Sequence, residues 1–142
     1  MIAQTHDFFH FPMRTCTCLA ETALWEGKLD EAEQWLRQSL GYHANPHQIT
    51  INEVAQLWVA ARLATAQKQY RRATTFFGLA EQAHSQIHYA IAGPMRALVD
   101  AALVTVRDAL DPAVFAEAFA TGQQMALAEA FATILAPTHI LP

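Results

Sequence analysis

The chain has 142 residues and a formal net charge of −4 at pH 7, with nine lysine and arginine residues against thirteen aspartate and glutamate residues. This balance provides no basic surface for the phosphates of a nucleic acid, so we expect no direct nucleic-acid binding. The length suits one domain, and a hydrophobic fraction of 53%, slightly above the ~45–50% of ordinary globular chains, allows a buried core without disulfides or a structural metal.

Export and membrane insertion are not indicated. Residues 1–13 contain acidic and histidine residues and no continuous apolar core, so they do not resemble a signal peptide. The most apolar segment, 94–110, is interrupted by four charged residues and is too short to cross a bilayer. Cys16 and Cys18 fall on different faces of a helix, which argues against a disulfide framework. We therefore expect a cytoplasmic protein with no membrane contact.

The first twelve residues show no helical period, although their three phenylalanines are too apolar for a free tail. We predict that the segment 1–12 is a non-helical aromatic cover over the end of the first hairpin, or that it packs against a partner. A single helical domain is predicted over 13–136. The two prolines in 137–142 indicate a carboxy-terminal stub.

The clearest helical pattern runs from Val54 to His88. Apolar residues recur at i, i+3, i+4 and i+7 in both halves, and the polar break at 67–69 is too short to lead anywhere except back along the first helix. We predict antiparallel helical hairpins at about 13–42, 51–88 and 94–121. A last short apolar helix at 127–135 is predicted to lie across the final hairpin as a cap.

Local signals mark where several helices begin. The run from Thr50 to Glu53 fits a capping box. In this motif the Thr50 hydroxyl accepts a hydrogen bond from the Glu53 amide, and the Glu53 carboxylate accepts one from the Thr50 amide. Pro94 and Pro112 each follow a turn residue and suit the first position of a helix, where a missing N–H costs nothing.

The hairpin pattern recurs along the chain in steps of forty-one residues. Leu57, Ala60, Ala61 and Ala64 align upstream with Cys16, Leu19, Ala20 and Ala23, and downstream with Leu98, Ala101, Ala102 and Thr105. This pattern, with Gly27 in a turn, resembles the tetratricopeptide repeat. The resemblance implies an all-α, right-handed array of antiparallel helical hairpins, a solenoid of about seven helices. The step exceeds the 34 residues usual for that family and falls in the range of HEAT or armadillo repeats, but the excess can be placed between hairpins, in 44–52.

A closer resemblance covers roughly residues 70–135. The segments RRATTFFGLAEQAHSQI, PMRALVDAALVTVRDAL and FAEAFATGQQMALAEAFATIL are similar to the carboxy-terminal end of the helical-repeat region in bacterial LuxR-type activators and signal-transducing ATPases. The chain departs from those regulators in having Ala126 where relatives commonly have serine, no G-x-x-x-x-G-K-[ST] motif and no helix-turn-helix. The resemblance therefore implies a repeat module alone, either as part of a longer regulator or as a free-standing scaffold.

Histidines supply the only repeated polar feature. His43 and His47 are four residues apart, and so are His84 and His88 one repeat later. Glu81 joins the second pair on one helical face, at a spacing that can hold a metal ion. We favour the alternative that both pairs face water at the ends of hairpins, so we expect no bound metal.

A second possible metal-binding set combines His6 and His10 with Cys16 and Cys18, but its spacing matches no zinc finger, and Cys16 falls on a core position of the repeat. Catalytic motifs such as H-E-x-x-H, G-x-S-x-G and S-x-x-K are absent. We therefore expect a protein that is not an enzyme and that carries no cofactor.

In tetratricopeptide repeats the first helix of each hairpin lines a concave groove. Carried onto this chain, the groove would contain Arg14, Thr17, Glu21, Leu24, Trp25, Ala55, Trp58, Arg62, Thr65, Arg96, Val99, Leu103, Val106 and Arg107. Tryptophan and arginine are the residue types most enriched at interface hot spots. The alternative is that Trp25 and Trp58 only pack between neighbouring hairpins.

Three functions fit these predictions. The first is a protein-interaction or scaffold module of a regulatory or signalling protein, which binds a partner or peptide in the groove. The second is a small-molecule effector sensor, and the third is assembly with a second copy as a homodimer. An open, arginine-lined groove would favour the first, a closed apolar pocket the second, and a large exposed apolar patch the third.

Overall fold

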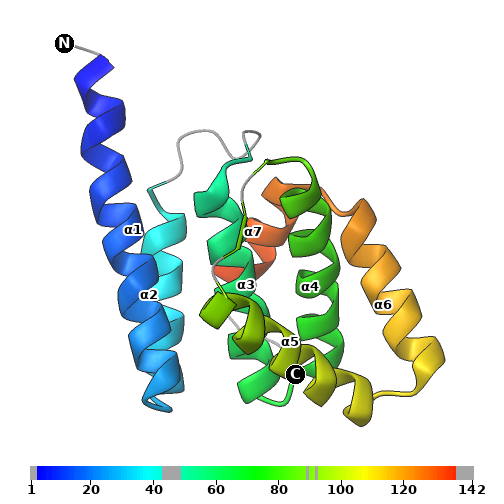
Figure 1. Cartoon of the computed structure of the whole chain (residues 1–142). Coiled ribbons are helices and arrows are strands. Elements are labelled where there is room, and N and C mark those ends of the chain that lie inside the picture. Colours follow the sequence, from blue (N-terminus) through cyan, green and yellow to red (C-terminus); the bar gives the residue numbers. More distant parts are fainter. Residues whose placement is uncertain (1–2, 43–48, 89, 92, 137–142) are drawn as a thin grey trace.

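The computed structural model of the chain describes residues 3–42, 49–88, 90–91 and 93–136. These residues form seven helices and no strand, so the predicted all-α class is confirmed (Figure 1). The helices are α1 (Ala3–Trp25), α2 (Leu29–Leu40), α3 (Ile51–Ala66), α4 (Tyr70–Ser85), α5 (Gly93–Ala109), α6 (Pro112–Gln124) and α7 (Leu127–Leu135). Within the described part of the chain, no helix is both long and apolar enough to span a bilayer. The predicted stub at 137–142 lies outside these residues.

Helix α1 begins ten residues earlier than the sequence pattern indicated. It starts at Ala3 and passes through Pro12, so the prediction of a non-helical segment over 1–12 is wrong for residues 3–12. Residues 3–11 contain no glycine or proline, and a proline inside a helix removes only one backbone hydrogen bond, so the helix can continue upstream. In Figure 1 the first turns of α1 extend past the end of α2.

The first two hairpins repeat the same turn. In each, the residue that reverses the chain has a left-handed backbone, Gly27 with φ 77° and Lys68 with φ 62°. The amide of the next residue then donates a hydrogen bond to an equivalent carbonyl of the preceding helix. Lys28 donates to Ala23 at 2.8 Å, and Gln69 donates to Ala64 at 2.9 Å. Because these residues are one repeat step apart, the turn supports the forty-one-residue repeat between α1–α2 and α3–α4.

Lys68 offers a test of this turn. A side chain in the left-handed region is strained, whereas glycine adopts it freely. We expect Lys68→Gly to raise the free energy of unfolding by about 0.5–1 kcal/mol, measured by urea denaturation. Gln69→Gly is the matched control, because Gln69 has φ −93° and gains nothing from a glycine. An equal response of both variants would contradict the prediction.

Burial follows the same repeat in the first two hairpins. The equivalent pairs Cys16 and Leu57, Ala20 and Ala61, Ala23 and Ala64, Ala32 and Ala73, and Leu36 and Phe77 are all buried, whereas Leu19 is exposed and its equivalent Ala60 is buried. The third unit departs from this frame. Thr105 is exposed where Ala64 is buried, and α5 instead buries Val99, Leu103 and Val106. The buried face of α5 is therefore displaced by about one residue from the face that the repeat predicts, which corresponds to a rotation of roughly 100° about the helix axis.

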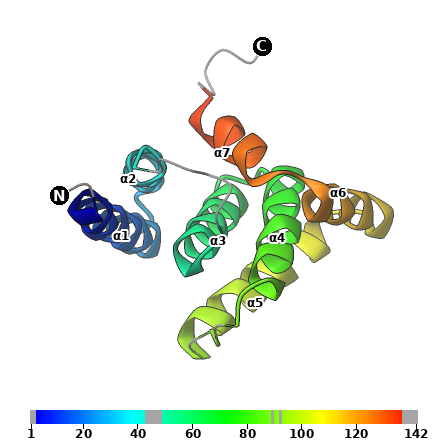
Figure 2. The same ribbon diagram turned by 90° about the horizontal axis from the view of Figure 1, so that it is seen from above.

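Helices α5 and α6 have nearly the predicted bounds, but they do not pack along each other as a hairpin. Helix α6 lies along α4 instead, and α5 crosses α3 and α4 (Figure 2). Gly78 and Gly122 make the approach of α6 possible. A Cβ atom at Gly78 would lie 2.2 Å from the carbonyl oxygen of Phe119, and one at Gly122 would lie 1.9 Å from that of Thr75.

Helix α7 has the predicted bounds but a different place. It covers the junction of α2, α3 and α4, the helices of the first two hairpins, and not the final pair (Figure 2). Its buried face carries Leu127, Ala130, Phe131 and Ile134. Two guanidinium groups hold its carboxy-terminal end. Arg37 donates to the carbonyl of Ala136 at 3.1 Å, and Arg72 donates to that of Thr133 at 3.4 Å.

Candidate functional site

One stripe of α1 faces α3. Arg14, Cys18, Glu21 and Trp25 follow one another at i, i+4, i+7 and i+11, so they lie on the same side of the helix. The first two line a pocket against α3, and Glu21 reaches Arg62 of α3. Trp25 continues the stripe at the last turn of the helix with 75% of its surface exposed. We call these four residues the α1 stripe.

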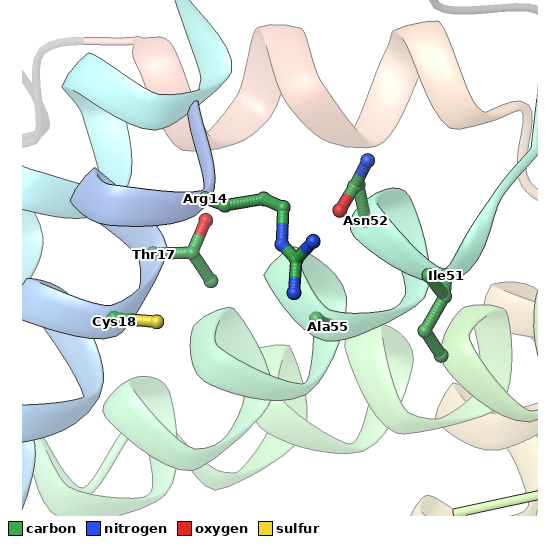
Figure 3. Close-up of a pocket in the computed structure, with 6 residues that line it drawn as sticks. All are labelled: Arg14, Thr17, Cys18, Ile51, Asn52 and Ala55. Carbon is green, nitrogen blue, oxygen red and sulfur yellow. The ribbon is translucent and has the colours of Figure 1, made fainter. Parts of the chain in front are cut away.

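The pocket lies between the middle of α1 and the first turns of α3, and has a volume of about 240 Å³. Its lining consists of Arg14, Thr17, Cys18, Ile51, Asn52 and Ala55. Figure 3 shows the Arg14 side chain extending from α1 toward α3, with its guanidinium between the Asn52 side chain and Ala55. We call this space the α1–α3 pocket.

Arg14 differs from Arg62 and Arg96, two other arginines predicted to line the groove. It makes no hydrogen bond or ion pair with the residues that the structure describes, and its side chain is exposed. Arg62 is paired with Glu21, and Arg96 lies 3.2 Å from the carboxylate of Asp100. The cation in the pocket is therefore available to a ligand.

The Glu21–Arg62 ion pair joins equivalent positions of the first two repeats. Its nitrogen and oxygen atoms are 2.6 Å apart, and the side chains are 24% and 8% exposed. The Arg62 guanidinium also lies 3.9 Å from the sulfur of Met95 on α5. This pair was predicted as groove lining, but Arg62 is buried beneath its neighbours and serves to connect α1, α3 and α5.

Trp58 is a packing residue and not an open groove residue. Only 2% of it is exposed, and its ring lies 5.5 Å from that of His84, centroid to centroid. Among the residues that the structure describes, its buried indole nitrogen has no hydrogen-bond partner. The alternative considered for the two tryptophans thus holds for Trp58, whereas Trp25 is exposed.

The predicted groove positions on α5 are distributed differently. Val99, Leu103 and Val106 are buried, because α5 is turned relative to the repeat, so their assignment to an open groove is wrong. Arg96 faces α4 and lies 3.5 Å from Glu81. Arg107 is exposed and stands over the ring of Phe115, 5.1 Å from its centroid, at the far side from α1.

Two of the predicted metal-binding candidates, Glu81 and His84, are engaged elsewhere. Glu81 pairs with Arg96, and His84 contacts Trp58. Among the side chains that the structure describes, no three histidine, cysteine, aspartate or glutamate residues are close enough to share an ion. His43 and His47, and the side chains of His6 and His10, lie outside what the structure describes.

The two cysteines have separate environments. Cys16 is buried in the α1–α2 hairpin, and burial raises the pKa of its thiol. Cys18 is exposed at the pocket and was not predicted there. Ile51 and Asn52 were also missed, although the capping box at Thr50 and Glu53 had located the start of α3 and so could have indicated which helical turn faces α1.

Comparisons with protein-family models, with curated proteins and with solved structures found no match for this chain.

Proposed function

We propose that the protein is a non-enzymatic interaction module that binds a peptide segment of a partner protein along the α1 stripe. The observation that carries the proposal is the exposure of Trp25 on the same stripe as the unpaired Arg14. A large, rigid aromatic side chain and a free guanidinium are the groups that contribute most to binding at interfaces. Both belong to one helix of a packed body, so little order has to be gained on binding.

The other two functions have less support. The α1–α3 pocket, at about 240 Å³, is smaller than the ~300–1,000 Å³ of typical small-molecule sites. Among the described side chains, which do not include those of residues 3–11, the large exposed apolar ones are dispersed over α1, α5 and α7. They do not supply the contiguous apolar patch that a stable homodimer interface would bury.

The proposal extends to the type of array. The repeated turn and the repeated buried positions support a tetratricopeptide-like arrangement for the first two hairpins, similar to the repeat regions of bacterial regulators. A right-handed solenoid is proposed for these two hairpins alone, because α5 and α6 depart from the repeat. Free thiols at Cys16 and Cys18 fit a reducing cytoplasm.

Peptides selected from a random display library against the purified chain provide the test. We expect Trp25→Ala to weaken their binding by roughly thirtyfold, the loss typical of a tryptophan hot spot. Fluorescence anisotropy of a labelled peptide gives the dissociation constants. Because Trp25 is 75% exposed, its truncation should leave the helical circular dichroism signal unchanged.

Leu19→Ala is the matched control. Leu19 is also a partly exposed apolar residue of α1 but lies outside the α1 stripe, so its truncation should not change peptide affinity. Failure to select any peptide, or equal binding by wild type and Trp25→Ala, would overturn the proposed function.

A further inference from the structure

We propose that the α1–α3 pocket takes a single carboxylate, the side chain of a glutamate in the partner segment, with Arg14 as its counter-ion. This inference rests on the proposed function, because it names the chemistry of one anchor of the bound peptide. Of the six described residues that line the pocket, one is a cation and none is an acid.

The carboxylates described within α1 and α3, those of Glu21 and Glu53, each have another partner and so do not neutralise Arg14. Glu21 is bound to Arg62 at 2.6 Å. Glu53 is buried in the capping box, where it accepts a hydrogen bond from the Thr50 amide at 2.7 Å. In a chain of net charge −4, the pocket therefore holds a cation that has no carboxylate partner among the described side chains.

The charge of the pocket matches a monoanion. The Asn52 amide at the start of α3 already donates to the Thr50 hydroxyl at 3.2 Å. That backbone donor is engaged, so among the described lining residues Arg14 alone supplies positive charge to the pocket. A doubly charged phosphate group would lack a second cation, whereas one guanidinium can bind one carboxylate through two parallel hydrogen bonds.

The shape and walls suit a side chain with a short apolar stem. Ile51 and Ala55 line one side of the pocket. On the other side the Thr17 hydroxyl is bonded to the Met13 carbonyl at 2.9 Å and to the Ser39 hydroxyl at 2.7 Å, so its methyl group is left for contact. A volume of about 240 Å³ corresponds to roughly eight waters, enough for a glutamate side chain and part of its backbone.

The probe for this site is N-acetyl-glutamate N-methylamide, titrated into the ¹⁵N-labelled chain. We expect saturable amide shifts in residues 14–18 and 51–55. The glutamine analogue should bind at least roughly tenfold more weakly, and Arg14→Gln should lower the affinity for the glutamate probe by a similar factor. Arg71→Gln is the control, because Arg71 is an exposed arginine of α4 outside the pocket, and it should bind the probe as wild type does.

Equal binding of the glutamine analogue, undiminished binding by Arg14→Gln, or the absence of saturable shifts would each overturn the inference. The selected peptides separate this failure from failure of the proposed function. Peptides that need Trp25 but are indifferent to Arg14→Gln would leave the proposed function standing without the carboxylate. Binding of the glutamate probe without any peptide ligand would overturn the partner assignment and mark the pocket as a site for a free acid.

Discussion

Replacement of Gly122 by alanine is expected to lower the free energy of unfolding by about 2–3 kcal/mol. Inside a helix this substitution normally stabilises by about 0.5–1 kcal/mol, because alanine restricts the unfolded chain. Here the new Cβ would lie 1.9 Å from the Thr75 oxygen and 3.0 Å from the Leu79 nitrogen, inside the backbone of α4. A backbone cannot move aside as a flexible side chain can, so α6 has to shift away from α4.

Urea denaturation of the whole chain measures this effect. Gly93→Ala is the control, because no atom lies within 4 Å of a Cβ built at Gly93. Gly78→Ala should resemble Gly122→Ala, since its Cβ would lie 2.2 Å from the Phe119 oxygen. A neutral or stabilising Gly122→Ala would show that α4 and α6 are not in close backbone contact.

Glu21→Gln is expected to lower the free energy of unfolding by about 3 kcal/mol. The substitution leaves the Arg62 guanidinium, only 8% exposed, without its carboxylate, and an uncompensated buried charge costs roughly 3–5 kcal/mol. We place the effect at the lower end, because Glu21 itself is 24% exposed and water can reach the pair from that side. The measurement is again urea denaturation at neutral pH.

Two variants separate the buried pair from ordinary surface charge. Glu117→Gln removes an exposed ion pair with Arg71, 3.7 Å long, and should change the stability by less than about 0.5 kcal/mol. Adding Arg62→Met to Glu21→Gln should recover part of the loss, because the unpaired charge is then gone. If the double variant is as unstable as the sum of the single variants, the two side chains do not interact.

The sequence was sufficient for those elements whose signals are local. The capping box at Thr50 and Glu53 is formed as predicted, and α7 spans the predicted residues. The α1 stripe also follows from the sequence, because helical spacing alone puts Arg14, Glu21 and Trp25 on one side of a helix.

The orientation of α5 could not be derived in the same way. Its apolar residues extend around more than half of the helix, so the repeat position at Leu98 and the observed one at Val99 both give a buried face. Which of the two faces is buried depends on α6, because α6 packs closely against one side of α4 at Gly78 and Gly122. Such a close approach depends on tertiary packing, and a single glycine inside a helical pattern does not predict it.

Only one side of the α1–α3 pocket could be predicted from the sequence. Its α1 side came from the repeat frame, whereas Ile51 and Asn52 lie at the very start of α3, where a frame based on the middle of each helix assigns no contact. The pairing state of each arginine was likewise inaccessible, because it depends on which carboxylate the fold brings within reach.

The position of α7 affects both the unfolding of the chain and its folding during synthesis. Units of a simple repeat array contact only their neighbours, so they can come apart one at a time. Here the hydrogen bond from Arg37 to Ala136 joins residues 99 positions apart and ties the first hairpin to the last helix. We therefore expect all helices to melt in one cooperative transition. During synthesis, we expect the apolar junction of α2, α3 and α4 to stay uncovered until α7 has emerged from the ribosome.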